Sequence, residues 1–244
     1  TLGNAKDVDL AVEAAKAVYP EWAALTSKRR GAIMMKFHEL CTRHSDELVE
    51  LIMAENGKNR TEAEGDLAKG LETVEWSCAI PQHIGAGRTL AVSGGVTCQE
   101  VHDPVGVVAC VVPFNFPFMV PMWTTPIALV AGNCVVLKPS EKVPMTMARV
   151  AALLSEAGVP DGAFQMVQGC KEVVDALCDH EGIGALTFVG SCAPRPAAPR
   201  RRPPTPSRPR SRVIYFLPAD RRALCVGVRA CCVVGGICEW GGAA

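Results

Sequence analysis

The chain has 244 residues, of which 49% are hydrophobic, and it carries 25 basic and 25 acidic side chains. This composition is sufficient for a buried core and excludes a globally disordered protein. Pro and Gly interrupt every long apolar run. We therefore expect no transmembrane helix and no membrane partner.

The charge is distributed unevenly along the chain. Residues 1–192 hold 15 Lys and Arg against 23 Asp and Glu, whereas residues 193–244 hold ten Arg, no Lys and two acidic residues. A protein surface that has evolved as one unit rarely switches from a mixture of Lys and Arg to Arg alone at a single position. The two stretches are therefore expected to differ in origin. The twelve cysteines lie partly in apolar runs and no signal peptide is evident, which favours a reducing compartment over a disulfide framework.

The first ninety residues are expected to form amphipathic helices, because their apolar side chains recur at helical spacing. Thr26 or Ser27 is the predicted cap of the second helix, and Gly57 is expected to end the third. Thr61 and Glu64 fit a capping box for the fourth helix. The apolar stripes are interpreted as core faces.

A hairpin and an alternating series of strands and helices follow. Gly94-Gly95 separates two segments of alternating polarity within residues 89–101, which predicts the hairpin. Short apolar strands alternating with helices predict a parallel, doubly wound α/β sheet covered by a helical layer. The predicted strands are Val105–Val112, Cys134–Leu137, Phe164–Val167 and Ala185–Val189, and the predicted helices lie near Phe118–Val130, Met145–Ala157 and Lys171–Asp179.

Residues 193–244 differ in character from the rest of the chain. Residues 193–212 contain seven Pro and seven Arg with no aliphatic side chain larger than Ala, a composition that predicts disorder. Residues 213–244 are apolar again without clean periodicity. Arg, Pro, Ala and Gly are also what GC-rich DNA yields in a wrong frame, so we interpret the tail as a frameshift, a retained intron or a gene-model error near Ser191.

Asn115 stands out in a Pro-bounded loop, PFNFP, directly after the first apolar strand of the sheet. A side-chain amide held at a strand end can donate a hydrogen bond to the oxyanion that forms when a nucleophile attacks a carbonyl. Asn is also common in turns for purely structural reasons.

Lys138 and Glu141 follow the next strand in the sequence KPSE. A lysine and a carboxylate three residues apart can bracket two ribose hydroxyls as donor and acceptor. The alternative is an ordinary surface ion pair at a helix start. At the end of the last predicted strand, Gly190-Ser191 is a candidate phosphate contact.

Three further candidates are weak. Residues 85–90 lack the third glycine of a dinucleotide-binding fingerprint and follow a helix. Cys225, Cys231, Cys232 and Cys238 form no CxxC pair and have no nearby histidine, so no metal site is predicted. The Arg-Pro tract could bind nucleic acid, but no aromatic platform or RNA-binding motif accompanies it, so no nucleic-acid partner is expected.

The PFNFP and KPSE motifs, with the spacing between them, resemble the aldehyde dehydrogenase superfamily. The segments KRRGAIMMKFHELCTRHSDELVELIMAENGK and VEWSCAIPQHIGA narrow the resemblance to its CoA-acylating methylmalonate-semialdehyde dehydrogenase branch, over about residues 5–191. The resemblance implies a helical layer on a Rossmann-like parallel sheet, with residues 1–192 as a partial NAD-binding domain.

The resemblance also implies roles for particular residues. Asn115 corresponds to the family's oxyanion donor. Lys142 stands where this branch usually has arginine, and lysine lacks the planar fork that makes stacked or bidentate contacts. The implied NAD contacts are Val112, Phe114, Lys138, Glu141, Lys142, Gly190 and Ser191.

Members of this branch use a cysteine thiolate to attack a small aldehyde, pass hydride to NAD⁺, and transfer the acyl group from a thioester to coenzyme A with loss of CO₂. The resemblance thus implies oxidation of malonate or methylmalonate semialdehyde in valine and pyrimidine catabolism. It further implies a homo-oligomer assembled through the hairpin near Ser93–Val105. The implied location is mitochondrial in eukaryotes and cytoplasmic in bacteria.

The resemblance stops near Ser191, before the region that carries the family's catalytic cysteine. We therefore expect a truncated form that lacks the nucleophile, and Cys225, Cys231 and Cys232 are not assigned to that role because no family motif surrounds them. The alternative is a non-catalytic dinucleotide-binding or assembly partner.

Overall fold

A parallel five-stranded sheet forms the centre of the protein. The computed structural model describes residues 2–84, 89–93, 96–99, 102–190 and 212–215. The strand order is β5-β4-β3-β6-β7, so the chain starts in the middle of the sheet and proceeds first to one edge and then to the other. This is a doubly wound arrangement. The strands are β3 (Val107–Val111), β4 (Cys134–Lys138), β5 (Phe164–Met166), β6 (Ile183–Phe188) and β7 (Arg212–Tyr215).

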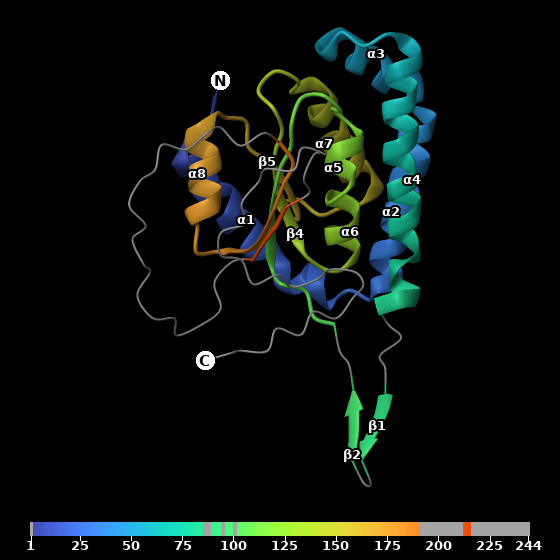
Figure 1. Ribbon diagram of the computed structural model, residues 1–244, viewed down its shortest axis with the longest axis vertical. Helices are drawn as coiled ribbons and strands as arrows, with labels where there is room; N and C mark the ends of the chain where they lie inside the picture. Colours follow the sequence, from blue (N-terminus) through green and yellow to red (C-terminus); the bar gives the residue numbers. More distant parts are fainter. Residues whose placement is uncertain (1, 85–88, 94–95, 100–101, 191–211, 216–244) are drawn as a thin grey trace.

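Helices cover both faces of this sheet (Figure 1). On one face lie α1 (Ala5–Ala24) and α8 (Lys171–Asp179). On the other lie α5 (Met119–Met122), α6 (Thr125–Val130) and α7 (Met145–Ala157). Outside these three helices, α2 (Ser27–Arg43), α3 (Ser45–Asn56) and α4 (Arg60–Ile84) form a further helical layer. The predicted fold class is confirmed.

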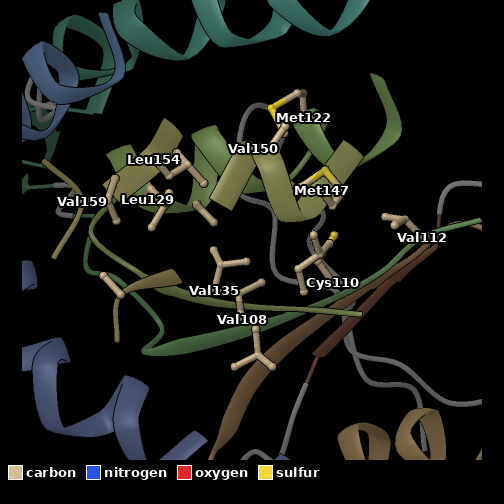
Figure 2. Packing of buried hydrophobic residues seen from close by; sticks show 14 of the residues in the cluster. Val108, Cys110, Val112, Met122, Leu129, Val135, Met147, Val150, Leu154 and Val159 are labelled. Atoms are coloured by element: carbon tan, nitrogen blue, oxygen red, sulfur yellow. The ribbon is translucent and has the colours of Figure 1, made fainter. Parts of the chain in front are cut away.

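The core lies between the sheet and its helices. Val108 and Val135 are register partners on β3 and β4 and are almost fully buried. Figure 2 shows side chains of these two strands facing those of the covering helices, among them Leu129, Met147, Val150 and Leu154. All five residues of β3 and of β4 are buried, as expected for parallel strands covered on both faces.

The predicted hairpin is present. β1 (Thr89–Ser93) pairs antiparallel with β2 (Val96–Gln99). The hairpin projects away from the body between the end of α4 and the start of β3 (Figure 1). Gly94 and Gly95, the predicted turn residues, lie outside the described residues.

The predicted helix over Phe118–Val130 is wrong in one respect, because the structure divides it into α5 and α6. The N–H groups of Trp123 and Thr124 donate to carbonyls three residues back, which tightens the end of α5. Pro126 has no N–H to donate, so it cannot continue α5 and instead lies in the first turn of α6.

The capping box of α4 also differs from the prediction. Asn59 and Glu62 form it, since the Glu62 N–H donates to Asn59 Oδ1 over 2.9 Å and the Asn59 N–H donates to Glu62 Oε2 over 3.3 Å. Thr61 and Glu64 already lie inside the helix, which begins at Arg60. The predicted capping box lay two residues too far along the chain, because Asn is as good a helix cap as Thr and Asn59 takes this position.

Other predicted boundaries agree closely with the structure. Helices α7 and α8 have the predicted ends, and Gly158 closes α7 in the left-handed region with a φ of 109°. Thr26 caps α2 by accepting a hydrogen bond from the Arg29 N–H. Gly57 ends α3 with a φ of 79°.

The strand β7 begins at Arg212, the last residue of the segment with predicted disorder, and continues into the apolar tail that lacks clean periodicity. It pairs in parallel with β6, with Val213 opposite Leu186, and its sequence RVIY is rich in residues that favour strands. The rest of the tail, residues 193–211 and 216–244, lies outside the described residues, so its predicted disorder stays a prediction. None of the described helices has the length and hydrophobicity needed to cross a membrane.

Candidate functional site

The carboxyl ends of three strands meet at one edge of the sheet. Val111 is the register partner of Lys138, and the Val112 N–H donates to the Lys138 carbonyl over 3.2 Å. On the other side of β3, the Val189 N–H donates to the Val111 carbonyl over 3.0 Å. The chain reverses its direction of winding between β3 and β6. In open α/β sheets, ligands bind in the crevice at this reversal.

Lys138 and Glu141 form a partly buried pair just after β4. Lys138 is 6% exposed, and its Nζ lies 3.3 Å from Glu141 Oε2. Within the described part of the chain, Glu141 is the only hydrogen-bonding partner of this ammonium, which leaves donors for a ligand. A hydrogen bond from its own backbone N–H and the nearby Lys138 ammonium hold the pKa of Glu141 below its ordinary value. The pair therefore presents a cation and a stable anion side by side.

Lys142 and Phe114 connect the loop after β4 to the loop after β3. The Lys142 ammonium lies 4.8 Å from the centroid of the Phe114 ring, a cation–π contact. The Lys142 N–H also donates to the hydroxyl of Ser140, which is almost buried. Lys142 therefore contacts an aromatic face within the chain itself, without the planar fork of arginine. The Phe114 ring itself is 47% exposed and remains accessible to a ligand.

Asn115 lies at the exposed tip of the loop between β3 and α5. Its side chain makes no hydrogen bond to any of the residues that the structure describes, so its amide is available as a donor. The backbone around it is held firmly. The Asn56 amide donates to the Phe114 carbonyl over 2.7 Å, and the Met119 N–H donates to Asp66 Oδ1 over 2.7 Å.

Asn56, Lys58 and Asp66 are contacts of this loop that the sequence reasoning missed. Lys58 Nζ lies 2.8 Å from Asp66 Oδ2 and 3.9 Å from the centroid of the Phe116 ring. Asp66 is only 1% exposed. One signal was available in the sequence, because Asp66 lies on the apolar stripe of α4 next to Leu67, and a carboxylate on such a stripe requires a specific partner.

The remaining predicted site residues lie at the same edge or outside the described part. Val112 is buried and its N–H is used in the sheet, as described above. Gly190 follows the Val189 contact with β3 and is half-buried. Ser191 lies outside the described residues. The structure therefore brings together Val112, Phe114, Lys138, Glu141 and Lys142, with Asn115 and Gly190 at the neighbouring strand ends.

Five cysteines of the described region are poorly suited to nucleophilic attack. Burial raises the pKa of Cys41 to about 12 and the pKa values of Cys110 and Cys134 to about 11. Burial also raises the pKa values of Cys78 and Cys178. Since the thiolate is the reactive form, none of these five thiols is a candidate nucleophile.

No group of three or more His, Cys, Asp or Glu side chains among the described residues could hold a metal ion. Cys225, Cys231, Cys232 and Cys238 lie outside those residues.

A doubly wound parallel sheet with polar side chains gathered at the carboxyl ends of its central strands defines a class of α/β protein that commonly binds nucleotides. Comparison with known proteins identifies the family within this class. The model of the aldehyde dehydrogenase family matches residues 1–194, and the chain belongs to this family. The predicted resemblance over about residues 5–191 is confirmed.

Several similar proteins are named malonate- or methylmalonate-semialdehyde dehydrogenase. A malonate-semialdehyde dehydrogenase of Geobacillus kaustophilus is 43% identical over 190 residues. The crystal structure of a methylmalonate-semialdehyde dehydrogenase from Oceanimonas doudoroffii has a TM-score of 0.75 at 43% identity. A Sinorhizobium meliloti 1021 protein solved with NAD has the same TM-score at 41% identity. Each comparison covers 78% of this chain and 39% of the relative, so the chain spans about two fifths of the relatives' length.

Proposed function

We propose that this chain supplies the NAD-binding and oxyanion-stabilising parts of a CoA-acylating malonate- or methylmalonate-semialdehyde dehydrogenase. The observation that supports this proposal most directly is that the loops after β3 and β4 contact each other at the carboxyl ends of these strands. The hydrogen bond from the Val112 N–H to the Lys138 carbonyl joins the strand ends, and Lys142 over Phe114 joins the loops that follow them. The names of the relatives support the branch.

The residues after β4 fit a ribose. The Glu141 carboxylate accepts hydrogen bonds from ribose hydroxyls, and the Lys138 ammonium donates one, because it has three donors and a single partner among the described residues. The Glu141 carboxylate is ionised near neutral pH, and its lowered pKa extends this to somewhat more acidic conditions. Bound NAD⁺ supplies the acceptor for the hydride that leaves the aldehyde carbon.

Asn115 is the proposed hydrogen-bond donor to the carbonyl oxygen of the aldehyde. When a nucleophile adds to the carbonyl carbon, the carbonyl oxygen gains negative charge, and the Asn115 amide donates a hydrogen bond to it. The anchoring of the loop at Phe114 and Met119 reduces the reorganisation that this contact requires. The five described cysteines with raised pKa values are not assigned as the nucleophile.

Further parts of the proposal rest on family membership. Coenzyme A is the proposed acyl acceptor, valine catabolism the proposed setting, and the mitochondrion the proposed location if the source is eukaryotic, otherwise the cytoplasm. The protein is proposed to form homo-oligomers through the β1–β2 hairpin. A two-stranded hairpin is marginally stable alone, and this one extends from the body (Figure 1), which supports a role in assembly.

A second candidate is a non-catalytic dinucleotide-binding or assembly partner. The Lys138–Glu141 pair favours it, because a ribose-binding site needs no nucleophile. Two assays on the purified chain test both candidates: NAD affinity by calorimetry, and NADH formation from malonate semialdehyde with coenzyme A. Turnover that Asn115→Ala abolishes supports a catalytic chain and contradicts the partner, whereas NAD binding without turnover agrees with a form that lacks the nucleophile and with the partner. A chain that neither binds NAD nor forms NADH contradicts both.

A further inference from the structure

Two adjacent residues at the end of α3 each hold one of the two site loops. The Asn56 amide donates to the Phe114 carbonyl in the loop that carries Asn115. The Glu55 carboxylate accepts the N–H groups of Met145 and Thr146, over 2.6 and 3.0 Å, and also the Thr146 hydroxyl. The outer helical layer therefore contacts both loops through one turn of helix.

The Glu55 contact replaces a missing cap. Pro144 occupies the N-cap position of α7 and offers no side-chain acceptor, so the first N–H groups of this helix depend on a residue from elsewhere. A carboxylate at this end also interacts favourably with the helix dipole. Because α7 starts three residues after Lys142, fixing Met145 restricts the segment that contains Lys138 and Glu141.

Gly57 and Lys58 follow Asn56 in the same turn, and Lys58 contacts the Asn115 loop on the C-terminal side of Asn115. Gly57 adopts a φ of 79°, a conformation that favours glycine. The next residue, Lys58, lies over the Phe116 ring and pairs with Asp66, whose other oxygen accepts the Met119 N–H. The loop is thus held on both sides of Asn115, at the Phe114 carbonyl and at the Phe116 ring and Met119 N–H.

We propose that the turn Glu55–Lys58, together with Asp66, positions the Asn115 loop and the Lys138–Glu141 segment relative to each other. These are positioning residues, and this role rests on the proposed function of the two loops. The turn makes the geometry of the cofactor site depend on a helical layer that does not itself line it.

The experiment compares Asn56→Ala and Asn56→Asp with wild type. The aspartate variant keeps the size of the side chain but cannot donate to the Phe114 carbonyl. Chymotrypsin cleavage between Phe114 and Asn115, identified by mass spectrometry, reports opening of this loop. Loss of one hydrogen bond of ordinary strength predicts about fivefold faster cleavage in both variants, and about fivefold weaker NAD binding.

Asn59→Ala is the matched control. It removes the cap of α4 three residues from Asn56, so it should lower the melting temperature while leaving the cleavage rate at Phe114 and the NAD affinity unchanged. Wild-type cleavage rates in both Asn56 variants overturn the proposal, as does equally fast cleavage in Asn59→Ala. Faster cleavage with unaltered NAD affinity also overturns it. If wild type binds no NAD, the proposed function fails, and the cleavage rates alone decide whether Asn56 positions the loop.

Discussion

The Lys142 ammonium stacks on the Phe114 ring at 4.8 Å from its centroid, so a side chain from the loop after β4 contacts a side chain from the loop after β3. The two residues are 28 positions apart in the sequence, and the parallel pairing of β3 with β4 brings them together. The contact ties the proposed ribose-binding segment to the loop that presents Asn115.

Replacing Lys142 by Gln should weaken NAD binding modestly. A partly exposed cation–π contact contributes about 0.5–1 kcal/mol, which corresponds to an affinity loss of about two- to fivefold. Lys142→Arg preserves a cation that stacks and should bind NAD within about twofold of wild type. Calorimetric titration with NAD measures both variants. A loss of NAD affinity of similar size in Lys142→Arg would show that the cation–π contact with Phe114 does not account for the effect of Lys142→Gln.

The acid sensitivity of folding should fall when Glu141 becomes Gln. Its pKa is lower in the folded chain, chiefly through the hydrogen bond from its own backbone N–H and also through Lys138. The carboxylate therefore contributes stability above its unfolded pKa, and this contribution is lost as pH falls through the folded pKa. Urea midpoints at about pH 7 and about pH 4 should differ less in Glu141→Gln than in wild type. The effect is small because the side chain is 39% exposed. An equal difference in the two proteins contradicts the assignment.

Arg30 should be a major contributor to stability. It is 7% exposed, and its guanidinium donates to the Val130 carbonyl over 2.8 Å, to the Ala23 carbonyl over 3.1 Å and to the Leu25 carbonyl. It thus satisfies carbonyls at the ends of both α1 and α6. Arg30→Met leaves these carbonyls without donors and should lower the free energy of unfolding by about 3 kcal/mol.

Arg43→Ala is the control for Arg30. Arg43 forms an exposed pair with Glu39, and its removal should change the free energy of unfolding by less than about 0.5 kcal/mol. Urea unfolding curves measure both. An Arg30→Met variant as stable as Arg43→Ala would show that the buried carbonyls find other donors.

Alkylation rates should separate the described cysteines into two groups. At about pH 8 a thiol with a pKa near 11 is ionised in only about one molecule in a thousand, and Cys110 and Cys134 are also buried. Cys170 is exposed. Peptide mapping after a short iodoacetamide pulse should show Cys170 modified at least about a hundredfold faster than Cys110 or Cys134. Rapid modification of Cys110 in the folded chain would contradict its assignment as a core residue.

Most of the sheet could be predicted from the sequence because the features that define its strands and their connections lie within short segments of the chain. Apolar runs such as that of β4 and the left-handed glycine at Gly158 leave clear patterns in the sequence. The division between α5 and α6 was missed because apolar periodicity continues across the prolines. Asn115, Lys138 and Glu141 were predicted as site residues from motifs, and this assignment stays a prediction. Asn56 was not predicted, because its contact with the Phe114 carbonyl spans 58 positions and leaves no local pattern.

The most direct test of the account is a comparison of two ligands on two proteins by calorimetry. The ligands are NAD and its analogue without the 2′-hydroxyl on the adenosine ribose, and the proteins are wild type and Glu141→Gln. If Glu141 accepts a hydrogen bond from the ribose, losing the hydroxyl should weaken binding to wild type by about tenfold or more. The same loss should be within about twofold in Glu141→Gln, because the charged acceptor is already gone. Equal losses in the two proteins, or no NAD binding by wild type, would contradict the proposed cofactor site.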